Sequence, residues 1–242
     1  MSNISVDYVD GPPSKLPYTT SEMGKLFRSA VFVGQPVSDK GAGDKAQKWL
    51  PLLAAYSGAR LEELAQLAVT DFKEEAGIPF IHFQVRYDGV DPGYLRSLKN
   101  APSYRKVPIH SVLLNLGILQ LVNTQRESGS VHLFPAMNWD ERKKRDKTFK
   151  VSAKFSKWWS SYSRPIVPDI RKSFHSFRHT FKNCLRNAGV AKALNDALTG
   201  HASSDESDLY GRDEEGLGFQ LPILAEAIEK LSHPEIDVRA IV

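Results

Sequence analysis

The chain has 242 residues, of which 41% are hydrophobic, enough for one sizeable core. Its 32 Lys and Arg residues against 28 Asp and Glu residues give a net charge of +4, which suits a polyanionic partner but equally fits a basic surface without one. The single cysteine, Cys184, excludes an internal disulfide framework and a cysteine-rich zinc site. No apolar run approaches the 18 residues of a membrane span, and the N-terminus lacks a signal-peptide pattern, so we expect a soluble protein in a reducing compartment.

The N-terminal segment, residues 1–16, contains Gly11-Pro12-Pro13 and is predicted to be a flexible tail or linker. Residues 17–242 are predicted to form one domain. Thr20-Ser21-Glu22-Met23 indicates a helix start, with a capping residue and an acidic first turn. The segment Gly34–Asp44, rich in Gly and Asp, is predicted to be a loop.

Further along the chain, apolar periodicity predicts helices, and alternating or β-rich stretches predict strands. The expected helices are Trp49–Tyr56, Arg60–Leu67, Ser111–Ser128, Lys150–Tyr162, Phe177–Ala188, Ala191–Leu198 and Leu221–Leu231. Two strands are expected over 78–87 and 104–109, with 94–98 as a possible third. The predicted fold class is therefore mainly α with a small antiparallel β-sheet (α+β).

Three short motifs contain the residues best suited to phosphodiester chemistry: Arg60 opens a predicted helix after Ser57-Gly58, His175 and Arg178 are three positions apart, and Gly200-His201 precedes Tyr210 by nine positions. Guanidinium groups clamp phosphate oxygens, and a helix N-terminus favours an anion. Tyrosine is a recognised covalent nucleophile whose phenolate nearby cations would stabilise.

Each motif also has an ordinary structural interpretation when it stands alone. Arg60 fits a helix start with an ordinary acidic first turn, while Glu63, one turn further on, could instead orient Arg60 or a neighbouring histidine. His175 and His179, spaced i and i+4, would permit a metal ion, but the motif holds no carboxylate, so no metal site is predicted.

Basic residues outside these motifs are further candidates. Lys99 lies in a turn between two predicted strands, where it could donate a proton to a leaving oxygen or simply be solvated. A basic cluster that could follow DNA phosphates, or form a solvated face, occupies residues 141–158 beside Trp158 and Trp159. The candidate DNA contacts are Arg105, Lys143, Lys144, Arg145 and Lys147.

Taken in order, the motifs resemble those of the tyrosine recombinase (phage integrase) family. Ser57-Gly58-Ala59-Arg60-Leu61-Glu62-Glu63-Leu64 is similar to its first arginine box, and Phe174-His175-Ser176-Phe177-Arg178-His179-Thr180-Phe181 to its second. The segment 99–108 resembles its lysine hairpin, Leu133-Phe134-Pro135 its lead-in to the later helices, and Leu198-Thr199-Gly200-His201 with Tyr210 its final box.

This resemblance implies an integrase-type catalytic domain that cleaves and rejoins DNA through a 3′-phosphotyrosyl intermediate. It implies that Tyr210 attacks the phosphate, that Arg60, Arg178 and His201 bind it, and that Lys99 protonates the leaving 5′-oxygen. His175 would assist proton transfer and Glu63 would support the site. No metal or other cofactor is implied. The expected compartment is the prokaryotic cytoplasm or nucleoid, with a phage-encoded origin also possible.

The implied partners are double-stranded DNA and further copies of the chain, as a tetramer on DNA. The predicted helix 221–231 could dock on a neighbouring protomer or on its own core. Family members usually have an N-terminal DNA-clamping domain, which we expect to be absent from this chain. Two alternatives remain: a catalytically silent integrase-like DNA-binding module, and a histidine-metal phosphodiesterase.

Overall fold

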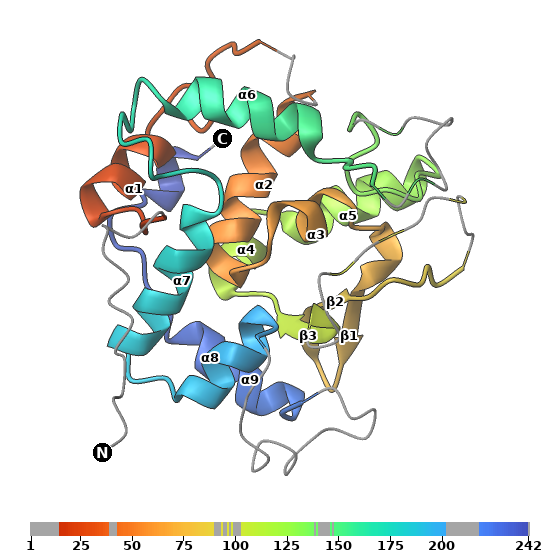
Figure 1. Ribbon diagram of the computed structural model, residues 1–242. Helices are drawn as coiled ribbons and strands as arrows, with labels where there is room; N and C mark the ends of the chain where they lie inside the picture. Colours follow the sequence, from red (N-terminus) through yellow and green to blue (C-terminus); the bar gives the residue numbers. More distant parts are fainter. Residues whose placement is uncertain are drawn as a thin grey trace, which may run out of the picture.

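The structure is a computed structural model, and it describes residues 15–38, 43–89, 93, 96, 98, 103–137, 139, 146, 148–201 and 218–241. The predicted tail, 1–16, falls mostly outside these residues. A central helix, α2 (Gly43–Ser57), is surrounded by shorter helices, and a small sheet lies at one side (Figure 1). The predicted α+β class is confirmed. None of the described helices has both the length and the apolar content needed to cross a bilayer.

The first helix, α1 (Thr20–Phe27), starts where the sequence predicts, because Thr19 and Glu22 form a reciprocal capping box. Helix α2 begins earlier than the expected Trp49 and includes Gly43 and Asp44, which composition had placed in a loop. Helix α3 (Leu61–Ala65) follows after a tight corner.

The sheet has the order β1-β2-β3 and is antiparallel throughout, with β1 (Phe72–Glu75), β2 (Ile78–Phe83) and β3 (Arg105–Pro108). A short 3-10 turn, η2 (Val69–Asp71), precedes it. Strands β2 and β3 match the expectation in shortened form. Of the possible strand 94–98, the two described residues, 96 and 98, carry no strand.

Strand β1 takes the place of the expected third strand. Its polar Lys-Glu-Glu sequence hid it, but it is joined to β2 by a two-residue turn in which Ala76 and Gly77 both have positive φ, 51° and 76°. Two left-handed residues in succession match the twist of a hairpin, so the turn chemistry defines this strand better than its side chains do.

The predicted helix Ser111–Ser128 is two helices, α4 (Ser111–Asn115) and α5 (Ile118–Glu127). Gly117 separates them with a φ of +90°, which glycine adopts without strain. The remaining helices agree with the prediction to within a few residues: α6 (Ala153–Ser163), α7 (Ser176–Asn187), α8 (Lys192–Thr199) and α9 (Leu221–Glu229), followed by a 3-10 turn η6 (Val238–Ala240).

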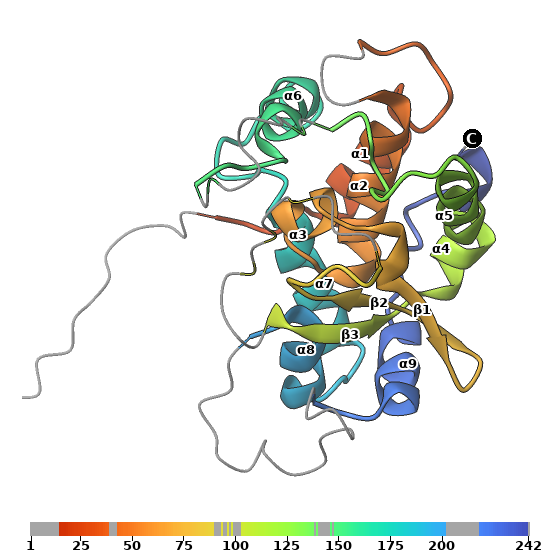
Figure 2. The ribbon, with the colours of Figure 1, turned by 90° about the vertical axis from the view of Figure 1, so that its right-hand side faces the viewer.

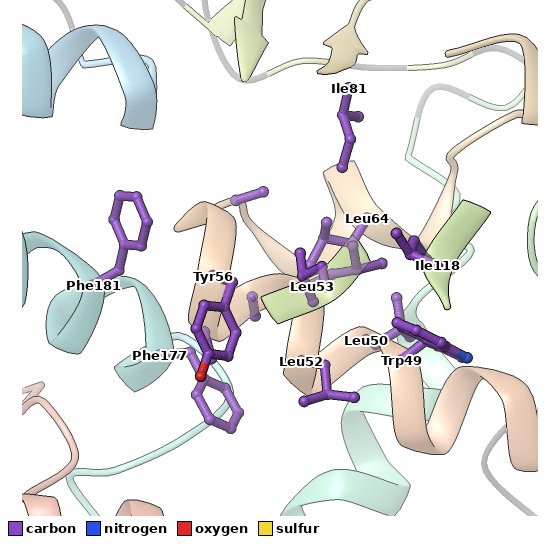
Figure 3. Close-up of a cluster of buried hydrophobic side chains, with 14 of the residues drawn as sticks. Trp49, Leu50, Leu52, Leu53, Tyr56, Leu64, Ile81, Ile118, Phe177 and Phe181 are labelled. Carbon is purple, nitrogen blue, oxygen red and sulfur yellow. The ribbon is translucent and has the colours of Figure 1, made fainter. Parts of the chain in front are cut away.

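The core gathers around α2, whose buried side chains meet residues from α3, α5, α7 and β2 (Figure 3). Helix α7 packs along α2, and α8 and α9 lie against β3 in both views (Figures 1 and 2). The apolar stripe of α9 therefore docks on its own core, with Leu221, Leu224 and Ile228 buried. Ile223, from the same predicted stripe, is 45% exposed.

After α9, His233 contacts α2; the sequence analysis did not select this residue. His233 is buried; its Nε2 lies 3.3 Å from the Ala55 carbonyl oxygen and its Nδ1 lies 3.3 Å from a Glu235 carboxylate oxygen. Burial opposes protonation, but hydrogen bonds with Cys184 and Glu235 outweigh it and raise the pKa of His233 to about 9.

Replacing His233 with glutamine should therefore destabilise the protein in a pH-dependent way. Because the folded-state pKa is raised from 6.5, the stabilisation is fully present below pH 6.5 and is lost as the pH rises through 9. We expect a loss of about 2 to 3 kcal/mol at pH 7 that largely disappears at pH 10. Urea denaturation of both proteins at the two pH values measures it.

His110→Gln is the matched control. His110 is also buried, with Nε2 3.0 Å from the Leu231 carbonyl oxygen, but burial lowers its pKa, so it is neutral in the folded protein at both pH values. The stability difference between the unaltered chain and His110→Gln should be equal at pH 7 and pH 10. A pH-independent loss for His233→Gln would contradict the charged-histidine explanation.

Candidate active site

The corner between α2 and α3 positions Arg60. Gly58, at a φ of +63°, ends α2, and Arg60 is extended immediately before α3. Glu63, one turn into α3, accepts the Arg60 backbone N–H at 2.9 Å and binds its Nη1 at 2.6 Å. Glu63 thus contacts both the backbone and the side chain of Arg60.

Glu63 is buried between two guanidinium groups. Besides Arg60 it binds Nη2 of Arg105 at 3.0 Å. Burial raises the pKa of a carboxylate, but Arg105 and Arg60 outweigh it and hold the pKa of Glu63 below its usual value. Glu63 is thus an ionised bridge between α3 and β3.

Arg105 does not lie where a DNA contact would place it. It is 2% exposed, donates to the carbonyl oxygens of Leu198 and Ser103 at 2.9 and 2.8 Å, and binds Glu63. Arg105 is buried because it lies on strand β3 and pairs with Glu63 of α3. The sequence pattern gave no sign of this partner. In this conformation Arg105 contacts Glu63, which in turn holds Arg60, and its burial keeps it from contacting a DNA backbone.

Arg178, in the first turn of α7, is 3% exposed and donates from Nη1 to the Gly58 carbonyl oxygen at 2.8 Å. Its Nη2 is buried and has no hydrogen-bond partner among the described residues. Burial, with Arg60 and Arg105 nearby, lowers the pKa of Arg178 to about 9. A buried cation with an unused donor is a site that an anion would complete.

His201 follows α8, which Gly200 ends with a φ of +63°. Its backbone N–H donates to the Asp196 carbonyl oxygen at 2.9 Å, and its side chain is exposed. Partial burial lowers the pKa of His201, and the charges of Lys182, Arg178 and Arg60 lower it further. The charges of both arginines therefore act on His201.

His175 caps α7 from an exposed position, and its ring meets that of His179 edge to face at a centroid distance of 4.9 Å. Over the described part of the chain, no cluster of three or more histidine, cysteine or carboxylate side chains could hold a metal ion.

Several predicted site residues lie outside the described residues: Lys99, Tyr210, Lys143, Lys144, Arg145 and Lys147. Of the basic cluster, Lys150, Lys154 and Lys157 are described and exposed, the last two on α6. Trp158 and Trp159 are buried in the core, so these rings pack the domain.

Three residues near the site were not identified as site residues by sequence. Ser103 accepts a hydrogen bond from Arg60 Nη1 at 3.1 Å, and Lys182 and Asp196 form an ion pair beside His201. These two contacts join residues 43 and 14 positions apart in sequence, so no local spacing signals them.

Gly58 lies two positions before Arg60, and its carbonyl binds Arg178, so it connects α2 to α7. A Cβ at this position would lie 2.4 Å from Cδ1 of Phe181 on α7. Gly58→Ala should therefore combine a left-handed strain of about 1 kcal/mol with a steric clash, and should displace the carbonyl that holds Arg178. We expect a loss of stability of at least about 2 kcal/mol in urea denaturation.

Gly77→Ala separates the two effects, because Gly77 has a similar φ, +76°, and nothing within 4 Å of the added Cβ. It should cost only the backbone strain, about 1 kcal/mol. Equal losses for the two variants would mean that the close approach of α2 to α7 is not a constraint.

Fold and site together define a mainly helical domain in which the charges of Arg60 and Arg178, from separate motifs, act on each other and on His201. The sequence model of the phage integrase family matches residues 37–215, and the chain belongs to that family. No curated protein matches the chain.

Two solved structures are similar in fold. One is the integrase from mycobacterium phage Brujita, with 17% identity and a TM-score of 0.51, covering 96% of this chain and 66% of that one. The other is the Tn1549 transposon integrase in complex with transposon right end DNA, with 17% identity and a TM-score of 0.50, covering 80% of this chain and 60% of that one. The chain thus spans slightly less than two thirds of these proteins.

Proposed function

We propose that the protein is a site-specific DNA recombinase that cleaves and rejoins strands through a 3′-phosphotyrosyl intermediate. The observation that best supports this proposal is at Arg178: its Nη1 binds the carbonyl of Gly58, two positions before Arg60, and its buried Nη2 has no partner among the described residues. The charges of Arg60 and Arg178 both act on His201. A phosphodiester presents non-bridging oxygens to such donors and gains negative charge in the transition state.

In the proposed reaction the Tyr210 oxygen attacks the scissile phosphorus, and the bond to the 5′-oxygen breaks. Lys99 protonates the leaving 5′-oxygen, while His175 assists removal of the phenol proton. Arg60 and Arg178 bind the non-bridging oxygens, and His201 adds a hydrogen bond. The phosphotyrosyl bond keeps the energy for rejoining, so the reaction consumes no nucleotide and needs no metal.

Glu63 and Arg105 support this arrangement from below. Glu63 fixes the Arg60 side chain, and Arg105 keeps Glu63 ionised. The exposed lysines of α6 and the basic segment before it are proposed to follow the DNA backbone, which would give salt-sensitive, sequence-independent affinity.

We also propose that the protein assembles as a tetramer on double-stranded DNA in the prokaryotic cytoplasm or nucleoid. Helix α9 packs on its own core in the described structure, so an exchange of this helix between protomers would require it to leave β3. Its exposed Ile223 is the residue through which a docked α9 could still meet a neighbour.

The test is a suicide DNA substrate whose cleaved strand releases a short fragment and so cannot be religated. The unaltered chain should form a protein–DNA adduct that survives denaturation, with or without a chelator, and Tyr210→Phe should form none. An adduct from the phenylalanine variant would overturn the assignment of the nucleophile. DNA binding without any cleavage would support a silent DNA-binding module, and chelator-sensitive cleavage a metal phosphodiesterase.

A further inference from the structure

The edge of the site formed by α7 and α8 contains an ion pair that the proposed reaction does not use. Lys182 of α7 binds Oδ1 of Asp196 on α8 at 3.0 Å, and Lys192 binds Oδ2 of the same carboxylate at 2.6 Å. Asp196 is 7% exposed, and the Lys182 side chain is 22% exposed, so this is a partly desolvated pair. Such pairs are less screened than surface ion pairs.

The same pair is connected to His201 through the backbone. The Asp196 carbonyl accepts the His201 N–H at 2.9 Å, and the neighbouring Asn195 donates from Nδ2 to the Lys182 carbonyl at 2.8 Å. The first bond lies within the C-terminal turn of α8, and the second joins α8 to α7 beside the ion pair. His201, which follows directly after the left-handed Gly200, is thus bonded to the backbone of Asp196, the residue whose carboxylate binds Lys182 on α7.

We propose that Lys182 and Asp196 are positioning residues for His201: their ion pair fixes its backbone against α7 and places an additional positive charge beside its imidazole. The inference rests on the proposed function, because it assigns His201 a role at the phosphodiester. The ammonium of Lys182 is the leading charge acting on His201, ahead of Arg178 and Arg60, while Asp196 acts in the opposite direction. Lys182 also acts on His179, on its own helix.

The consequence concerns which form of His201 is present at neutral pH. Partial burial, together with the charges of Lys182, Arg178 and Arg60, lowers the pKa of His201, and only Asp196 acts to raise it, so the imidazole is neutral at pH 7 and donates a single N–H. Without Lys182, the His201 imidazole is protonated more easily, and the protonated ring is charged and donates from both of its nitrogens. The pair would thus control the pH at which the site changes its hydrogen-bonding state.

The experiment is an NMR titration of histidine-labelled full-length protein, with the His201 signal assigned by its absence in His201→Gln. In Lys182→Met the His201 pKa should rise by roughly half a unit to one unit. Lys192→Met is the matched control: Lys192 binds the same carboxylate but its side chain is 85% exposed, so the shift should be clearly smaller. Lys182→Arg should restore the original titration.

Adduct formation with the suicide substrate should be measured across the same pH range. The part of this pH profile that reports His201 titration should shift to higher pH in Lys182→Met, by the same amount as the NMR midpoint. If Lys182→Met and Lys192→Met titrate alike, the inference is wrong, whatever the activity. If neither the unaltered chain nor any variant forms an adduct but the NMR shift is seen, the proposed function is wrong. The effect of Lys182 on the His201 pKa is then still supported.

If Lys182→Met does not fold, Asp196→Asn provides the second route. It removes the side-chain bond to Lys182 but keeps the backbone carbonyl that accepts the His201 N–H. The carboxylate that favours protonation is lost, so the His201 pKa should fall. A rise in that pKa would contradict the arrangement described for the pair.

Discussion

Arg178→Met should reduce the rate of covalent adduct formation by about a hundredfold to a thousandfold, the effect of removing one preorganised donor to a developing oxyanion. Methionine fills a similar volume but carries neither the charge nor the Nη1 bond to Gly58. Single-turnover cleavage of the suicide substrate, at saturating protein, measures the rate of the chemical step.

The same substitution should not destabilise the free protein. Arg178 is buried, has an unused donor and lies beside Arg60 and Arg105, so its charge is unfavourable until an anion arrives. We expect the free energy of unfolding to be unchanged or higher in Arg178→Met. Sulfate should raise the melting temperature of the unaltered protein, because it binds only the folded state, and should raise that of the variant less.

Arg126→Met is the control for loss of a guanidinium elsewhere. Arg126 on α5 donates to the carbonyl oxygens of Val69 and Phe72 at 3.0 and 2.9 Å. Its replacement should cost about 1 kcal/mol of stability and leave adduct formation intact. A destabilised Arg178→Met with normal cleavage would mean that Arg178 is a structural residue.

For Arg178 and Arg105 the sequence predicted the residue type suited to phosphate binding, but it did not predict which side chain is paired with a buried carboxylate. The motif predicted a phosphate role for Arg178 at a helix start, and Arg178 lies in the first turn of α7. Arg105 has the same chemistry, but its burial depends on Glu63, 42 positions away, and on the Leu198 carbonyl. A cation is buried or exposed according to tertiary partners that local spacing does not encode.

The fold divides in the same way. Helices whose apolar stripe meets the core, such as α7, were predicted closely because periodicity and burial have a common cause. Strand β1 was missed because its Lys-Glu-Glu residues belong to an exposed edge, and the break at Gly117 was missed because apolar residues continue across it. Both depend on backbone conformation at single positions.

Glu63→Gln should have the largest effect on stability among the changes considered. It leaves Arg60 and the buried Arg105 without their shared carboxylate, and an uncompensated buried charge costs about 3 to 5 kcal/mol. Glu62→Gln is the matched control on the same helix turn. Glu62 accepts the backbone N–H groups of Val151 and Ser152 at 3.0 and 3.1 Å, and glutamine keeps an acceptor there, so the loss should be about 1 kcal/mol.

The pH dependence of this loss follows from the lowered pKa of Glu63. Burial works against ionisation, and Arg105 and Arg60 overcome it, so the folded-state pKa lies below the unfolded value. The stabilisation is therefore present above the unfolded pKa, near 4.3, and is lost as the pH falls through the folded pKa. Urea denaturation should show a constant difference between the two proteins from pH 5 to pH 7 and a shrinking one below pH 4.

A double variant separates loss of the carboxylate from loss of packing. Arg105→Met should itself be destabilising, because it removes one partner of a buried pair, but combined with Glu63→Gln it removes the uncompensated cation as well. The double variant should then be more stable than the sum of the single losses predicts, by about 1 to 3 kcal/mol. Strict additivity would show that Glu63 and Arg105 do not act as a pair, and that Arg60 alone is what Glu63 holds in place.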